Sequence, residues 1–257
     1  MRSTLTLLGL TILALLWAAP AEADPMDQAR QAYQAGDWQE AARLAGEAGG
    51  AEGYAWAAGS LVAQLMLEAD YPDRETLAEQ AVEHGEMALR LDPDSIEARW
   101  RLAGALGFQG RYMSGWRAYL RGVPQRGRDL LQDTLNAEPD NAWAWGMWGA
   151  WNLEVARRGG RRGMRALDAS IEEGLAAYET AIALDPDNPS PHYFKAVGLI
   201  AIDTDYAADA RSALDAALAL QPRDAFEAGI LDEARRLSAL MDRPRQAQRW
   251  ANQRMQI

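Results

Sequence analysis

The 257-residue chain has no cysteine, only one lysine (Lys195) and only two histidines. The lack of cysteine excludes disulfides, a lipid-modified cysteine and a thiol nucleophile, so burial alone must stabilise the fold. His84 and His192 lie far apart and lack the spacing of metal ligands. No G-x-S-x-G and no phosphate-binding loop occurs. These absences favour a non-enzymatic protein without a cofactor or metal.

Long apolar runs are also scarce. The only one is Leu5–Trp17, which has the length of a signal-peptide core and is too short to span a bilayer. An A-x-A cleavage signal follows at residues 21–23. We therefore expect residues 1–23 to be a signal peptide, the mature chain to start at Asp24, and the protein to be exported to the periplasm. An uncleaved anchor is the alternative. No later run reaches the ~20 apolar residues of a membrane span.

Acidic residues are absent from two stretches that are rich in arginine. Residues 98–128 hold seven Arg and residues 155–167 hold five, with no Asp or Glu in either. Together they contribute +12 to a chain whose net charge is −11, so the rest carries −23. The acidic total argues against nucleic acid as a partner. Arginine suits carboxylates and phosphates because its planar guanidinium can donate two parallel hydrogen bonds.

Prolines in turns divide the chain into repeating units. Pro93, Pro139, Pro186 and Pro222 are 46, 47 and 36 residues apart. Residues of the repeat pattern recur at fixed spacing before each proline, as in Gly174, Tyr178, Ala181 and Pro186, where they are small, large and small. The start of one unit reads Trp145-x-x-Trp148-Gly149. These patterns resemble the 34-residue tetratricopeptide repeat, with inserts near 110–123 and 158–168.

The repeat pattern predicts an all-α, right-handed superhelix of about five helix-turn-helix units with a C-terminal capping helix. The expected repeats are 25–53, 54–94, 95–140, 141–187 and 188–223, followed by a cap at 224–242 and a tail helix at 243–257.

One segment narrows the family further. Residues 147–156 read M-W-G-A-W-N-L-E-V-A and precede a basic insert. This resembles the L-G-R-W-x-F-E-V-A segment of regulator of microtubule dynamics proteins, and the likeness covers roughly residues 75–222. Ala150 departs from it, because the family has Arg there. The tetratricopeptide subunits of periplasmic solute transporters are similar in architecture. Both resemblances imply a protein that binds partners or ligands. A microtubule role is not expected of an exported chain.

The tryptophan-rich unit supplies one set of candidate site residues. Trp145 and Trp148 occupy core positions of the repeat, whereas Trp143 and Trp151 do not and could line a concave groove. Asn152 stands where the repeat has a large aromatic residue and should find a hydrogen-bond partner. Glu154 precedes Arg158 by one helical turn, which favours a local ion pair. The groove candidates are therefore Trp143, Trp151, Asn152 and Glu154.

The arginines of the two inserts form the second set. They are expected to meet in space and to bind an anionic partner, or else to pair with acids of neighbouring helices. The candidates are Arg117, Arg121, Arg126, Arg128, Arg157, Arg158, Arg161, Arg162 and Arg165.

Two functions fit these features. The first is a scaffold that binds a protein partner through the concave face of its repeats. The second is a carrier of a small acidic amphiphile or lipid, held under the tryptophan cluster with an arginine rim. A carrier needs an enclosed apolar pocket of roughly 300 Å³ or more, whereas a protein-binding groove is open.

Overall fold

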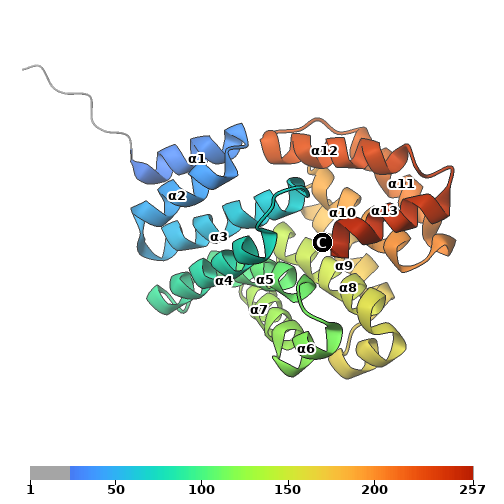
Figure 1. The fold of residues 1–257 in the computed structure, drawn as a ribbon, viewed down its shortest axis with the longest axis horizontal. Helices are drawn as coiled ribbons and strands as arrows, with labels where there is room; N and C mark the ends of the chain where they lie inside the picture. The colour runs from blue at the N-terminus through green and yellow to red at the C-terminus, as the bar shows by residue number, and fades with distance from the viewer. Residues whose placement is uncertain (1–23, 257) are drawn as a thin grey trace, which may run out of the picture.

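The computed structural model describes residues 24–256, so the predicted signal peptide lies outside the described residues. All regular structure between residues 24 and 256 is helical (Figure 1). The α-helices are α1 Pro25–Ala35, α2 Trp38–Ala48, α3 Gly50–Leu67, α4 Arg74–Leu91, α5 Ile96–Arg111, α6 Gly115–Leu120, α7 Val123–Ala137, α8 Ala142–Leu167, α9 Ile171–Leu184, α10 Pro189–Ile202, α11 Ala207–Leu218, α12 Ala225–Ser238 and α13 Pro244–Gln256. A short 3-10 helix, η1, spans Thr204–Tyr206.

Consecutive helices form hairpins that stack on one another. The pairs are α1–α2, α3–α4, α5–α7, α8–α9 and α10–α11. The first helices contact one another in the order α3, α5, α8, α10, and so form the inner layer. The second helices lie outside them. The predicted all-α repeat superhelix is thus confirmed.

Polar residues beside the turns start the helices. The side chain of Asn141 accepts a hydrogen bond from the backbone N–H of Ala144 at 2.9 Å, and Ser95 does the same for Ala98 at 3.2 Å. Asn188 likewise caps α10. Each cap satisfies one of the backbone donors left free at a helix start. The Pro-bearing turns therefore both end one helix and begin the next.

Small residues allow the helices of a pair to approach closely. A Cβ added to Gly149 would lie 2.7 Å from a ring carbon of Tyr178, so α8 and α9 could not meet as they do with a larger residue there. Tyr178 is fully buried, and Trp148 on the same side of α8 is 5% exposed. Gly149 therefore allows Tyr178, the large residue of the small–large–small pattern on α9, to pack closely against α8.

The second insert, predicted near residues 158–168, is itself helical. α8 continues to Leu167 through a kink at Gly160, whose φ of 53° and ψ of −155° favour glycine. The first insert contains the short helix α6. Both inserts therefore project as helical segments, at the lower edge of the molecule in Figure 1.

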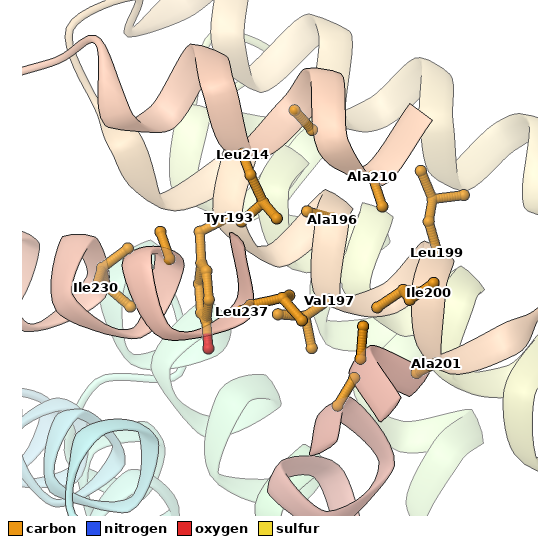
Figure 2. Close-up of a cluster of buried hydrophobic side chains, with 14 of the residues drawn as sticks. Tyr193, Ala196, Val197, Leu199, Ile200, Ala201, Ala210, Leu214, Ile230 and Leu237 are labelled. Atoms are coloured by element: carbon orange, nitrogen blue, oxygen red, sulfur yellow. The ribbon is translucent and has the colours of Figure 1, made fainter. Parts of the chain in front are cut away.

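The C-terminal helices cover the inner side of α10. Figure 2 shows Tyr193, Val197 and Ile200 of α10 packed among side chains of the following helices, including Leu214 of α11 and Leu237 of α12. α12 also contacts α1 and α3, so the last repeats touch the first. The superhelix closes on itself instead of remaining an open solenoid.

Candidate functional site

The two inserts lie side by side. The guanidinium of Arg158 donates hydrogen bonds to the carbonyls of Gly110 at 2.8 Å and Met113 at 2.6 Å. Arg128 of α7 donates a hydrogen bond to the carbonyl of Leu167, at the end of α8, at 3.4 Å. These bonds tie the α5–α6 connection and α7 to the C-terminal half of α8. We call α6 and Arg121 together with residues 161–167 the insert surface.

The nine candidate arginines fall into two groups. Four have acidic partners: Arg126 pairs with Glu86 at 2.6 Å, Arg128 with Asp129 at 3.0 Å, and both Arg157 and Arg158 with Glu154, at 2.7 and 4.0 Å. The other five are exposed, and their guanidinium groups make no ion pair or hydrogen bond with any residue from 24 to 256. These five are Arg117, Arg121, Arg161, Arg162 and Arg165. Local pairing thus accounts for only part of the basic inserts.

Exposed apolar side chains accompany the five unpaired arginines. Trp116 is 70% exposed, Leu120 64% and Tyr119 39%. They occupy positions i, i+3 and i+4 of α6 and so share one face, while Ala118 faces inward and is buried. The sequence interpretation missed these three residues, although their helical spacing inside a basic insert could have indicated them.

Three of the groove candidates have partners within the fold. The indole of Trp151 stacks on Trp148 with centroids 5.1 Å apart and donates to the carbonyl of Pro124. Asn152 is fully buried, donates to the carbonyl of Trp148 and accepts from the backbone N–H of Ser170. Glu154 accepts both hydrogen bonds from Arg157. The contacts of Trp151 and Asn152 join α8 to α7 and to the start of α9, whereas the pair of Glu154 and Arg157 lies within α8.

Trp143, the fourth groove candidate, lies on the inner face and is 36% exposed. Its ring stacks on Trp100 at 6.2 Å and lies 6.0 Å from Phe226 of the capping helix. These rings belong to a series of contacts that runs around the inside of the superhelix, which we call the inner aromatic cluster. Its members are Tyr33, Trp38, Trp56, Trp100, Trp143 and Phe226.

A buried cation completes the inner aromatic cluster. The guanidinium of Arg101 lies 4.6 Å from the centroids of both Trp56 and Trp100 and pairs with Glu97 at 2.8 Å. Such a sandwich combines cation–π attraction with an ion pair. Burial raises the pKa of the neighbouring Tyr33 to about 12. At this end, the chain's own side chains occupy the inner face.

Arg111, at the end of α5, is different. Its guanidinium is half-buried, lies 4.1 Å from the ring of Phe108 and has no acidic partner within residues 24–256. Burial lowers the pKa of Arg111, and the nearby charges of Arg157 and Arg74 lower it further, against the field of Glu154. Since Glu154 is already bonded to Arg157, Arg111 is left without an acidic side chain of its own to pair with.

Two hollows among the described residues are open grooves. One, of about 670 Å³, runs between α7 and α9 over Trp145 and Trp148 of α8. A second, of about 310 Å³, lies beside Arg121 and Arg126. Neither is the enclosed apolar pocket that a carrier of a small amphiphile requires.

Three further features concern the described part of the chain. No group of three or more His, Cys, Asp and Glu side chains among residues 24–256 is placed to hold a metal ion. His84 is stacked against Tyr54 at 5.8 Å, and burial lowers its pKa. No helix in the described residues is long and apolar enough to cross a membrane.

Comparisons with known proteins agree with this architecture. The family model described as regulator of microtubule dynamics protein 1-3 matches residues 25–242. Among solved structures, a thermophilic TPR protein of Thermus thermophilus superposes with a TM-score of 0.60 at 20% sequence identity. That match covers 82% of this chain and 96% of the other, and it supports the fold alone. No curated protein sequence matches the chain.

Proposed function

Because the chain belongs to the regulator of microtubule dynamics protein 1-3 family and folds as a tetratricopeptide-type repeat superhelix, we propose that it is a non-enzymatic scaffold that binds a protein partner. Repeat superhelices have extended binding surfaces. Such a surface can contact a protein segment at many points along its length, which a small substrate could not use. The N-terminal sequence supports a periplasmic location, and the scaffold proposal does not depend on it.

The partner-binding region we propose is the inner face between α5 and α8. The chain's own aromatic residues fill one end of the inner face, and α12 and α13 cover α10. Between them, Gly107 and Ala150 are exposed, and a Cβ on Gly107 would meet nothing within 4 Å. Small exposed residues on two facing helices leave room for a bound segment next to Trp143.

The observation that carries the proposal is the unpaired guanidinium of Arg111 at the end of this stretch. Burial disfavours the charged form of Arg111, and repulsion from Arg157 and Arg74 works against the attraction of Glu154. A carboxylate supplied by a bound segment would offset both effects. We therefore expect the partner to bind through an acidic segment, with binding that weakens as salt rises.

Replacing Arg111 tests this arrangement. Arg111→Met keeps an apolar stem against Phe108 and removes the charge. We expect capture of the partner to fall about tenfold or more, the usual effect of losing a desolvated charge pair, while the melting temperature stays the same or rises. Affinity capture at low and high salt, with the retained proteins identified by mass spectrometry, measures the first effect. Thermal melts measure the second.

The matched control is Arg43→Met on the exposed surface of α2. It changes the net charge equally, but Arg43 is paired with Glu40 and Glu47. Capture should be unaffected by this control. A partner that is retained equally by wild type and Arg111→Met would exclude Arg111 as its binding residue.

A further inference from the structure

The outer face of α6 is apolar and faces solvent. Trp116, Tyr119 and Leu120 share this face, and the rings of Trp116 and Tyr119 stack at 6.5 Å without cover from the rest of the described chain. Exposed tryptophans at this level are uncommon on soluble proteins, because burying such a ring stabilises a fold by ~2–3 kcal/mol. The fold gives up that stabilisation at α6.

Positive charge surrounds this apolar face. Arg117 of α6 and Arg121, the residue that follows α6, lie beside it. Arg161, Arg162 and Arg165 project from the neighbouring end of α8, which Arg158 holds in place. None of the five is neutralised by an acid in residues 24–256. In a chain with a net charge of −11, this is a localised basic surface with an aromatic centre.

We propose that the insert surface docks the protein on an anionic lipid bilayer. Trp and Tyr favour the level of the lipid headgroups, Leu120 can enter the outer acyl region, and each Arg near an anionic bilayer adds about 1 kcal/mol of attraction. The net acidity of the remaining surface would keep the other faces away from the lipid, so the charge distribution also selects the orientation.

A bilayer fits this surface better than a protein partner. α6 projects at one edge of the molecule (Figure 1), and its exposed apolar face comprises three side chains. A stable protein interface buries ~800 Å² on each partner, which one face of a six-residue helix cannot supply. A bilayer accepts a few inserted side chains without a complementary pocket. This inference does not rest on Arg111 or on the inner face.

The absence of cysteine permits a direct test with a single label. Leu120→Cys carrying an environment-sensitive fluorophore reports whether α6 enters lipid, even if the apolar run at residues 5–17 also binds vesicles. With the purified full chain, we expect a blue shift and a rise in emission on adding phosphatidylcholine vesicles that contain phosphatidylglycerol. Pure phosphatidylcholine vesicles should give little change. The same label at Leu184→Cys, an exposed residue at the end of α9, should not respond.

The second part of the test replaces the arginines of the insert surface. Replacing Arg117, Arg121, Arg161, Arg162 and Arg165 by Gln should lower vesicle partitioning by about fivefold per residue. Arg235→Gln with Arg236→Gln on α12 changes the net charge by two and should have little effect, in contrast to Arg161→Gln with Arg162→Gln. A label at position 120 that stays in water with anionic vesicles, or that responds equally to neutral vesicles, would overturn the proposal.

Discussion

At the scale of single residues, the structural role of a side chain depends on its hydrogen-bond partners more than on its residue type. Asn152 replaces the large aromatic residue of the repeat pattern, and it is fully buried. Its amide joins the carbonyl of Trp148 to the backbone N–H of Ser170, the residue that caps α9. One polar side chain thereby fixes the start of the second helix against the first, a task that an apolar ring could not perform.

Asn152→Ala should therefore destabilise the fold by about 1–3 kcal/mol, the cost of leaving the partly buried backbone N–H of Ser170 without an acceptor. Urea unfolding followed by circular dichroism gives the free energy of unfolding. Ser170→Ala is the comparison. It removes only the 3.0 Å cap to Glu173 and should cost about 1 kcal/mol. An Asn152→Ala cost below ~0.5 kcal/mol would mean that water replaces the amide.

At the scale of the element, the kink in α8 decides where the second insert points. Gly160 adopts a conformation that is nearly restricted to glycine, and Gly159 beside it has ordinary helical geometry. Residues before the kink pair with Glu154 and hold the first insert through Arg158. Residues after it carry the unpaired Arg161, Arg162 and Arg165. The kink therefore separates the structural arginines from the exposed ones.

Gly160→Ala should cost about 1–3 kcal/mol, because alanine rarely tolerates this φ and ψ. If the helix straightens to avoid the strain, Arg158 loses Gly110 and amide exchange should rise in residues 110–122. Gly159→Ala is the matched control and should stabilise α8 by up to about 1 kcal/mol. Denaturant unfolding and amide hydrogen exchange separate the two variants. Equal effects of both would show that the kink is not maintained by Gly160.

The helices and their order were predictable from the sequence because the turn prolines, caps and small residues act locally. The conformation of the inserts was not, since a glycine pair can end a helix or kink it. Pairing of Arg126 with Glu86, 40 residues away, also depends on the fold. The inner aromatic cluster could not be predicted from the sequence for the same reason, because Tyr33 and Phe226 meet only when the superhelix closes.

At the scale of the whole molecule, closure distinguishes this chain from a linear repeat array. In a linear array each unit touches only its neighbours, so damage at one end leaves the other unaffected. Here Phe226 of α12 contacts Tyr33 and Trp38 of the first helical pair, at 6.5 and 6.3 Å between ring centroids. The cap thus supports the first repeat as well as the last, which should make unfolding more cooperative.

Phe226→Ala tests this coupling, since it removes a buried ring shared by both ends. We expect a loss of about 3–5 kcal/mol, the usual cost of truncating a buried aromatic residue. Amide exchange should rise in α1 and α2, although they lie far from the substitution in the sequence. Leu237→Ala, also in α12, truncates a buried residue that packs with α10 and should leave exchange in α1 unchanged. If both substitutions leave α1 and α2 protected as in wild type, the ends are independent and the superhelix behaves as an open array.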